Sequence, residues 1–328
     1  MSSPKISAFV ICYNRADLLA TCLRALAFAD ELIVVDKSST DHSRLIAETL
    51  ATRVVTVPWT PTVEETRTLA LSLCRHEWVL FMDDDECLSP EAARLIQAEV
   101  LNPSADIYAF PQRHYILGVH DERAYYWPEH QIRLFRRGAV TFSRTVHAGI
   151  VRHSDRMLEL ATKDGVCIHH LSHPDVSSWI EKTNRYTSRP DRVGCPAASD
   201  GLAAFAHQRI DHWMGCTRDD DPNGYPAAVA LLRAVYDMVD ALKTWETERG
   251  LAGAALFKQV CNAFDAAREQ KADSAAARRQ SCANDLISGC SCVDDQPKSV
   301  PRSWSTILDE PTGKKPVEDL LSLVTDMI

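Results

Sequence analysis

The hydrophobic pattern in the first third of the chain predicts buried strands separated by amphipathic helices. Four short runs rich in Val, Ile and Phe are almost continuously apolar, as strands buried on both faces of a sheet are. These runs are Ile6–Cys12, Leu32–Val35, Val54–Val57 and Trp78–Met82. Between them, apolar residues recur at the spacing of a helix face. We therefore expect an α/β fold built on a doubly wound sheet.

The pattern farther along the chain is less regular. A helix is predicted over Pro90–Leu101, a strand over Ile107–Phe110, and a long helix with one apolar face over Tyr225–Trp245. The stretch Gln112–Arg144 is rich in His, Tyr and Trp without a clear period, and we expect it to be irregular. Beyond about Ala266 the periodicity is lost, which predicts a loosely packed tail.

Composition and charge exclude several classes of protein. The 328 residues carry 36 Lys and Arg against 45 Asp and Glu, a formal net charge of −9, which argues against a general nucleic-acid binder. Eleven cysteines, with no secretory leader, favour a reducing cytosol. Pro222–Leu232, among the longest charge-free stretches, is far shorter than the roughly 20 residues that span a bilayer. We expect a cytoplasmic protein.

Polar residues follow three of the four predicted strands, at the edge of a doubly wound sheet where ligands bind. They are Tyr13-Asn14-Arg15, Asp36–Asp41 and Asp83-Asp84-Asp85-Glu86. Adjacent carboxylates repel one another, and Mg²⁺ or Mn²⁺ would relieve that repulsion while leaving coordination positions for substrate phosphates. Asp83 and Asp85 therefore predict a metal and diphosphate site. The alternative is a solvated acidic turn before the helix at Pro90.

Several motifs, in order, resemble the inverting family 2 glycosyltransferases of GT-A fold. In the first half of the chain they are Ile11–Arg15, Leu32–Asp36, Ser39-Thr40-Asp41 and Trp78–Glu86. Two later segments resemble the bacterial branch of that family that builds lipopolysaccharide core and other surface glycans. These are Gln131–Arg137 followed by Val146-His147, and Asn223-Gly224-Tyr225 leading into Ala230–Glu246. The resemblance covers roughly residues 5–250.

The resemblance implies a Rossmann-like GT-A domain with a mixed sheet and a helical C-terminal extension. Residues 1–110 would form the nucleotide-sugar-binding half, 111–190 the acceptor-side half, 191–265 a helical region and 266–328 the tail. The implied reaction is metal-dependent transfer of a hexose, with inversion, from a nucleotide-diphosphate sugar such as a UDP-hexose. The implied cofactor is Mn²⁺ or Mg²⁺, and the implied acceptor is a glycan or glycolipid of the bacterial surface.

A glycolipid acceptor would bring the protein to the inner face of the membrane. The segment Tyr225–Arg249 carries three basic and four acidic residues, a poor match for an anionic lipid surface. We therefore expect at most a weak peripheral contact with the membrane.

The resemblance also gives roles on the nucleoside side of the donor. Tyr13, with Asn14 beside it, would stack on the nucleobase. Asp36 would accept a hydrogen bond from the base, and Arg67 would reach the nucleotide from the helix expected after Pro61. The alternatives are a strand-end core tyrosine, a carboxylate that caps its own turn, and an exposed helical arginine.

The acidic motif and two histidines would hold the ribose, the metal and the diphosphate. Asp83 and Asp84 are assigned to the nucleotide, and Asp85, together with Asp83, to the metal. His147 and His173 are candidates for a further metal or phosphate contact. His173 is preferred over its neighbouring histidines because the family often places a histidine before a helix.

An inverting transfer needs a base that removes the proton of the acceptor hydroxyl. The family places a carboxylate shortly before the Arg-Leu-Phe segment, and Glu129 is the favoured candidate, with Asp121 and Glu122 as alternatives. An ordinary surface ion pair is the competing interpretation. Ala148 follows His147 where the related branch often has glutamate, which leaves the choice of base open.

Two other functions compete with transfer. Asp83 and Asp85 after an apolar strand also suit a haloacid dehalogenase-like phosphohydrolase with Asp83 as nucleophile, but Cys87 stands where that motif has Thr or Val. The second alternative is a nucleotide-sugar-binding module without activity. Loss of turnover with preserved nucleotide binding in a Glu129 variant would separate an enzyme from such a module.

Overall fold

The computed structural model describes residues 4–61, 63–143, 149–162, 165–189, 201–217, 223–250 and 253–288. The chain forms two compact units, Met1–Glu248 and Arg249–Ile328. The first unit contains every strand that the structure describes, and the site is built within it.

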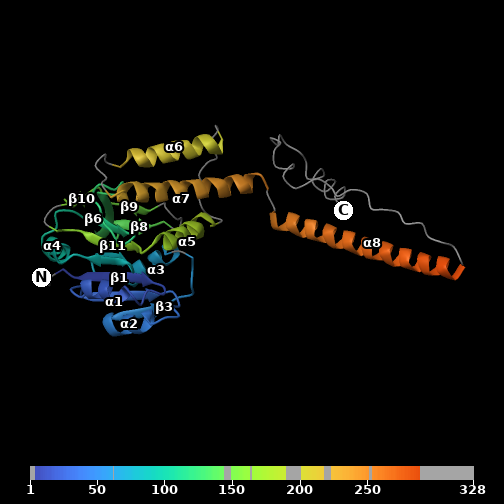
Figure 1. Ribbon diagram of the computed structural model, residues 1–328. Helices are drawn as coiled ribbons and strands as arrows, with labels where there is room; N and C mark the ends of the chain where they lie inside the picture. Colours follow the sequence, from blue (N-terminus) through green and yellow to red (C-terminus); the bar gives the residue numbers. More distant parts are fainter. Residues whose placement is uncertain are drawn as a thin grey trace. The chain divides into compact units, whose positions relative to one another are not determined.

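A mixed sheet forms the centre of the first unit (Figure 1). Its strands are β1 Ile6–Cys12, β2 Glu31–Asp36, β3 Arg53–Thr56, β4 Trp78–Asp83, β5 Glu86–Leu88, β6 Ile107–Ile116, β7 Glu129–Arg136, β10 Met157–Glu159 and β11 Ile168–His173. Their order is β3-β2-β1-β4-β7-β6-β11-β5, with β10 paired to β6. The first four strands run parallel, whereas β7 is antiparallel to both β4 and β6. The carboxyl ends of β1, β2 and β4 therefore meet at one edge, as the sequence predicts.

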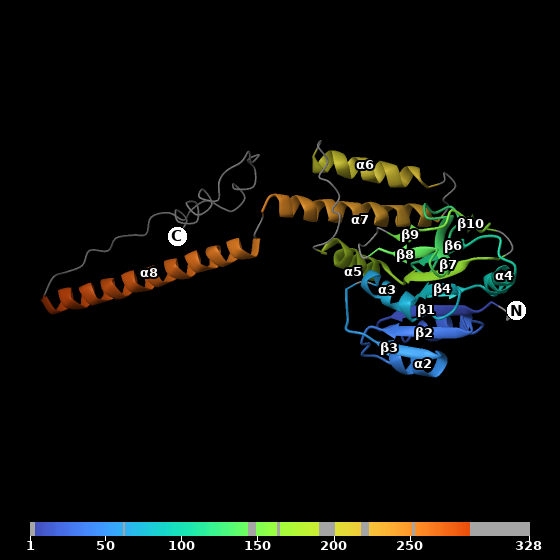
Figure 2. The ribbon, with the colours of Figure 1, turned by 180° about the vertical axis from the view of Figure 1, so that it is seen from behind.

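Helices cover both faces of the sheet (Figure 2). The helices α1 Leu19–Ala25, α2 Ser43–Leu50 and α4 Pro90–Leu101 contribute to one buried core with the sheet residues Val10 and Leu80. On the other face, α3 (Glu64–Leu73) and a small sheet of β8 (Val140–Phe142) and β9 (Ile150–Arg152) enclose Phe9 and Phe81. The predicted α/β class with a doubly wound, mixed sheet is confirmed.

Three further helices complete the first unit. They are α5 Val176–Thr187, α6 Leu202–Gly215 and α7 Tyr225–Glu248, and α7 packs against both of the others. The hydroxyl of Tyr225 donates to the carbonyl of Ile116 at 2.8 Å, which ties the start of α7 to the end of β6. In the middle of α7, Asp237 is buried and accepts hydrogen bonds from Arg209 and Trp213 of α6, each at 2.7 Å.

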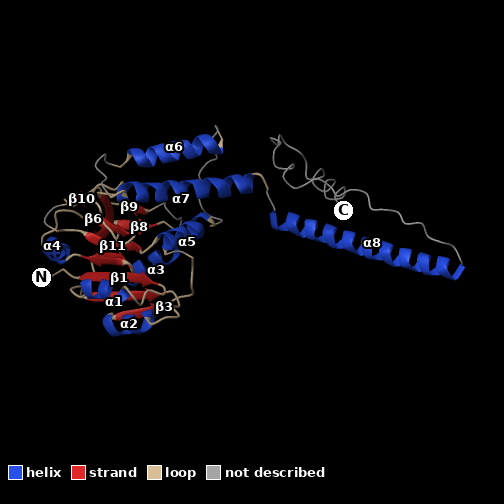
Figure 3. Ribbon diagram, in the orientation of Figure 1, coloured by secondary structure: helices blue, strands red, loops and turns tan. Residues whose placement is uncertain are grey.

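The expectation of irregular structure over Gln112–Arg144 is wrong in part. β6 continues to Ile116, and β7 and β8 lie wholly inside this stretch (Figure 3). A search for continuous apolar runs misses the end of β6 and β7 because polar residues of these strands line a cavity, and it misses β8 because that strand is only three residues long.

The tail predicted after Ala266 is helical as far as the structure describes it, and its described side chains are almost all exposed, which agrees with loose packing. The helix α8 spans Gly253–Ser288 without interruption, so the proposed boundary at 265/266 falls inside it. The sequence there is rich in Ala, Arg, Gln and Lys, which favour a helix through backbone propensity even without an apolar stripe. None of the described helices is both long and apolar enough to cross a bilayer.

Candidate active site

The acidic motif forms a tight turn between β4 and β5. Asp83 ends β4, Asp84 and Asp85 make the turn, and Glu86 begins β5. β5 pairs antiparallel with β11 in a register that sets Glu86 opposite His170. The turn is therefore fixed to the far side of the sheet as well as to its centre.

Two arginines neutralise Asp83. Arg67 Nη2 lies 3.0 Å from Oδ1, and Arg133 Nη2 lies 3.0 Å from Oδ2. Arg133 also donates from Nε to Glu86 at 2.9 Å, and the buried Glu86 accepts a further hydrogen bond from Gln112. Burial opposes ionisation of Asp83, but the two arginines outweigh it and lower the pKa of its carboxyl. Both oxygens of this ionised carboxylate are thus already bonded.

Asp85 and Asp84 have opposite electrostatic surroundings. Asp85 Oδ2 accepts from Arg15 Nη2 at 3.1 Å, and Oδ1 lies 3.4 Å from His170 Nε2. Burial opposes ionisation of Asp85, yet His170 and Arg15 hold the pKa of its carboxyl well below its usual range. Asp84 accepts a hydrogen bond from the backbone N–H of Tyr13 at 3.2 Å. Burial and the charge of Asp85 raise the pKa of Asp84 to about 7.

The protein's own cations therefore compensate much of the repulsion from which the sequence predicted a metal. Arg15 and Arg133 were not among the predicted site residues, and His170 was a candidate ranked below His173. Arg15 stands in the polar segment after β1, and Arg133 alternates along β7 with Glu129 and Gln131. That period of two is the signal by which the polar face of β7 could have been found.

Asp36 and Asn14 organise the turns at the edge of the sheet. Asp36 is fully buried, and its Oδ1 accepts from the backbone N–H of Ser39 at 3.1 Å, which is the turn-capping alternative. Asn14 adopts a positive φ of 50°, and its Oδ1 accepts from the backbone N–H of Thr40 at 2.7 Å. Contact of either side chain with a nucleobase stays a prediction.

Tyr13 is accessible to a ligand, and its stacking on a nucleobase stays a prediction. It is an exposed aromatic at the carboxyl end of β1, and its ring centroid lies 6.0 Å from that of Trp59, which follows β3 and is also exposed. The core alternative for Tyr13 does not hold. Trp59 was not predicted, although it is an aromatic residue directly beyond an expected strand.

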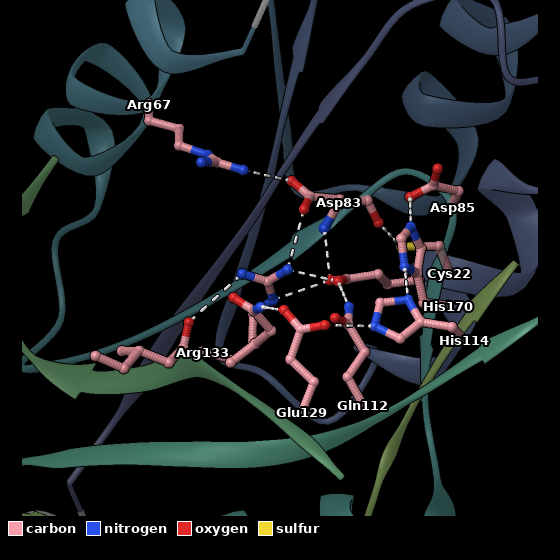
Figure 4. A network of polar contacts seen from close by, with 12 residues as sticks. Cys22, Arg67, Asp83, Asp85, Gln112, His114, Glu129, Arg133 and His170 are labelled. Atoms are coloured by element: carbon pink, nitrogen blue, oxygen red, sulfur yellow. Dashed lines mark hydrogen bonds and ion pairs between the residues drawn. The ribbon is translucent and has the colours of Figure 1, made fainter. Parts of the chain in front are cut away.

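A cavity of about 650 Å³ brings the acidic motif and the favoured base together. Its wall includes Arg67, Asp83 and Arg133 on one side and Glu129, His114 and His170 on the other (Figure 4). Asp83 ends a strand of the predicted donor half, whereas Glu129 begins β7 in the predicted acceptor half. The cavity is thus lined by two segments, around Asp83 and Glu129, that lie 46 residues apart in the sequence (129 − 83).

Two hydrogen bonds and an ion pair join Glu129 to Asp85 in a continuous chain (Figure 4). Glu129 Oε2 lies 3.1 Å from His114 Nε2, His114 Nδ1 lies 2.8 Å from His170 Nδ1, and His170 Nε2 faces Asp85. Burial opposes ionisation of Glu129, but the hydrogen bond from His114 lowers the pKa of the carboxyl below its ordinary value. Burial lowers the pKa of His114, whereas Asp85 overcomes burial and raises the pKa of His170.

The other candidates for the base lie elsewhere. Asp121 and Glu122, both within the described range 63–143, do not line the cavity. Asp121 is bonded at both oxygens by Arg123, which lowers the pKa of its carboxyl to about 2. Glu122 is exposed and pairs with Arg113 at 3.3 Å. Of the three carboxylates, only Glu129 lines the cavity.

Of the two histidines assigned to the metal, the structure describes only His173, whose pKa is influenced by the nearby charges of Asp85 and Arg15, and its contact with a metal stays a prediction. His173 is buried, and its ring centroid lies 4.6 Å from that of Trp179, with Ser172 hydrogen-bonded to Nδ1. Burial lowers the pKa of His173 to about 3. His147 falls outside the described residues.

The carboxylates nevertheless fit a divalent cation. In the part of the chain that the structure describes, no three His, Cys, Asp or Glu side chains gather into a ready-made metal site. Mg²⁺ commonly takes only one or two carboxylates and completes its coordination with substrate phosphates and water. Asp85 and Asp83, both ionised, supply hard oxygen ligands of that kind.

Sequence comparison decides the family. The model of Glycosyl transferase family 2 matches residues 7–172, a range that includes the acidic motif, Glu129 and His170. The chain belongs to this family. The resemblance expected from the motifs is thereby confirmed, and the phosphohydrolase alternative is set aside.

Bacterial relatives agree with this assignment. An uncharacterized glycosyltransferase of Rickettsia felis is 31% identical over 195 residues, 56% of this chain and 68% of that protein. Its counterpart in Rickettsia bellii is 30% identical over 194 residues, and the chain spans just under two thirds of its length, 65%. The lipopolysaccharide core biosynthesis glycosyltransferase LpsC of Rhizobium meliloti is 31% identical over 160 residues, 44% of this chain and 57% of LpsC.

Among solved structures, S. aureus TarS 1–349 in complex with UDP-GlcNAc matches over 75% of this chain and 92% of that chain. The identity is 14% and the TM-score 0.41, too low for features of TarS to be carried over to this family member.

Proposed function

We propose that this chain is a metal-dependent, inverting glycosyltransferase that moves a hexose from a nucleotide-diphosphate sugar, a UDP-hexose, to a hydroxyl of a bacterial surface glycan or glycolipid. The observation that carries the proposal is the shared cavity, where Asp83 of the acidic motif and the ionised Glu129 face one space of about 650 Å³. A transferase needs the group that holds the donor and the base that activates the acceptor on either side of the transferred sugar.

The donor diphosphate is assigned to the acidic turn. Asp85, with Asp83, would hold Mn²⁺ or Mg²⁺, which when bound neutralises negative charge on the leaving nucleoside diphosphate. Arg67 and Arg133 keep Asp83 ionised and in place from two sides. Tyr13 offers an exposed ring for the nucleobase at the same edge of the sheet.

Glu129 is assigned to the acceptor. Its carboxylate removes the proton of the acceptor hydroxyl as the hydroxyl oxygen bonds to the anomeric carbon. The bond from that carbon to the diphosphate oxygen breaks on the opposite face, and the leaving nucleoside diphosphate takes its electron pair. This single displacement inverts the configuration at the anomeric carbon.

The class of acceptor is supported by sequence similarity. LpsC, which is named for lipopolysaccharide core biosynthesis, is 31% identical over 160 residues. An acceptor of this class is an oligosaccharide built on a lipid, so the protein would work at the inner face of the membrane through a weak peripheral contact.

Calorimetric titration with UDP, with and without Mn²⁺, tests the donor site. We expect binding that depends on the metal, is weaker for GDP and ADP, and falls at least about tenfold in Asp85→Ala. Asp155→Ala, an exposed carboxylate outside the cavity, is the matched control and should bind UDP as the wild type does. If no nucleotide binds with the metal present, the proposal is wrong. If UDP binds but wild-type protein never turns over a donor, the chain is instead an inactive nucleotide-sugar-binding module.

A further inference from the structure

The contacts of the imidazole pair behind Glu129 limit where its protons can lie. The two Nδ1 atoms of His114 and His170 are 2.8 Å apart, so one must carry a hydrogen and the other must accept it. The Nε2 atoms face carboxylates, Glu129 at 3.1 Å from His114 and Asp85 at 3.4 Å from His170, and a lone pair there would be repelled. Both Nε2 atoms therefore carry hydrogens.

The remaining proton belongs to the His170 side of the pair. His114 is half-buried, with its ring centroid 5.2 Å from that of Tyr126. His170, in contrast, faces Asp85 and stands opposite Glu86 in the strand register, and these two carboxylates favour a positive charge on His170. The Nδ1 of His114 therefore accepts from His170, and its Nε2–H is left to donate to Glu129. In this arrangement β11, through His170, sets the tautomer of His114 on β6, and His114 in turn holds the carboxylate at the start of β7.

We propose that His114 is a positioning residue, which fixes the carboxylate of Glu129 toward the cavity through an Nε2–H hydrogen bond whose direction is set by His170. The inference rests on the proposed function, since it gives His114 a task only if Glu129 is the base. Gln131 Nε2 binds the other oxygen, Oε1, at 2.7 Å, so the carboxylate is held by one hydrogen bond at each oxygen. Both donors come from strands of the sheet, which makes the orientation rigid.

The closing experiment follows UDP release from UDP-glucose and from UDP-N-acetylglucosamine with Mn²⁺, with water as the acceptor. In His114→Ala we expect kcat to fall about 10–100-fold, while KM for the donor and Kd for UDP stay within about twofold. His114→Gln, whose amide N–H can take the place of Nε2–H, should recover most of the lost kcat. His169→Gln is the matched control, because His169 lies on β11 next to His170 and bonds to Tyr115 of β6 without lining the cavity. It should behave as the wild type.

A second readout separates positioning of Glu129 from a general loss of folding. The groups that face Glu129 are His114 from β6, with His170 behind it on β11, and Gln131 from β7. Without the His114 hydrogen bond the ionised carboxylate is less stable, so the acid limb of the kcat profile should move up by about one pH unit in His114→Ala. It should move little in His114→Gln.

The possible outcomes distinguish this inference from the proposed function. Wild-type kcat and an unmoved acid limb in His114→Ala, together with lost kcat in Glu129→Gln, would overturn the role of His114 alone. Equal loss in His114→Ala and His114→Gln, with no shift of the acid limb, would show a merely structural role and would also overturn it. Absence of UDP release from wild-type protein that binds UDP would overturn the proposed function, and this inference with it.

Discussion

Arg15 and Asp85 are joined across the edge of the sheet: the guanidinium after β1 donates from Nη2 to the carboxylate after β4 at 3.1 Å. Arg15 lies also 3.6 Å from Asp84 through Nε. A cation of the protein thus already occupies one oxygen of the carboxylate to which we assign the metal. The guanidinium and a divalent ion would compete for the same charge.

Arg15→Ala should therefore destabilise the metal-free protein and increase its response to metal. Loss of a partly buried ion pair predicts a decrease of about 1–2 kcal/mol in the free energy of unfolding in urea without metal. Mn²⁺ should raise the urea midpoint more in the variant than in the wild type. Arg44→Ala, which removes an exposed pair with Glu48, is the control and should change neither quantity. Equal responses to Mn²⁺ in wild type and Arg15→Ala would contradict competition at Asp85.

The three carboxylates proposed as base should differ sharply in activity. Glu129→Gln should lower kcat for UDP release about 10²–10⁴-fold with UDP binding preserved, because only Glu129 lines the cavity. Asp121→Asn and Glu122→Gln should keep kcat within a few-fold of the wild type. Steady-state kinetics on the three variants decides the question, and an inactive, folded Glu122→Gln would reverse the assignment.

Burial of His173 predicts a pH dependence of stability. The pKa of the folded imidazole is about 3, against an ordinary value of 6.5, so between these values the unfolded chain binds a proton that the folded protein does not. The contribution of the neutral His173 to the free energy of unfolding is complete above about pH 6.5 and is lost as the pH falls toward 3. His173→Gln should make the decline between pH 7 and pH 4 shallower by about 2–3 kcal/mol in urea titrations. The exposed His153→Gln should leave the slope unchanged. A slope that is the same in His173→Gln would show that the imidazole is protonated in the folded state.

Asp237 should be essential for the attachment of α6. Its Oδ2 accepts from both Arg209 and Trp213, and the side chain is buried. Asp237→Ala should lower the free energy of unfolding by about 2–3 kcal/mol, because it leaves Arg209 without this partner. Amide hydrogen exchange should rise first in α6. Asp211→Ala, on the exposed side of the same helix, should leave exchange unchanged, and slow exchange of α6 in Asp237→Ala would contradict the role.

The sequence predicts the centre of the fold closely because burial there is complete. β1 spans the same residues as the apolar run Ile6–Cys12, and α4 begins and ends where the pattern places it. Ser89 caps α4 by accepting from the backbone N–H of Ala92, and Pro90 follows it at the first helical position. The sequence does not predict β7, because the polar residues of this strand face the cavity and interrupt its apolar pattern. It does not predict α8 either, because this helix forms through backbone propensity and has no apolar face whose period could be recognised.

The carboxylates of the site are predictable, whereas their partners are not. Asp83 and Asp85 are visible as a motif in four adjacent residues. Arg133 and Arg15, which bind them, stand 50 and 70 residues away in the chain, and nothing local marks them as neighbours. The link from Glu129 to His114 and His170 likewise needs the pairing of three strands. Only the folded structure shows which cationic side chain pairs with which carboxylate.

The antiparallel pairing of β5 with β11 sets limits on how this enzyme could be recombined with its relatives. Residues 86–88 pair with residues 168–170. The acidic turn is therefore also held by a strand that lies 80 residues downstream (168 − 88). A chimera that exchanged only the first 110 residues would join a new turn to the old β11. A chimera that takes its N-terminal segment from a relative should also take that relative's counterpart of Ile168–His173. The part to be exchanged is therefore made of two segments that are separate in the sequence.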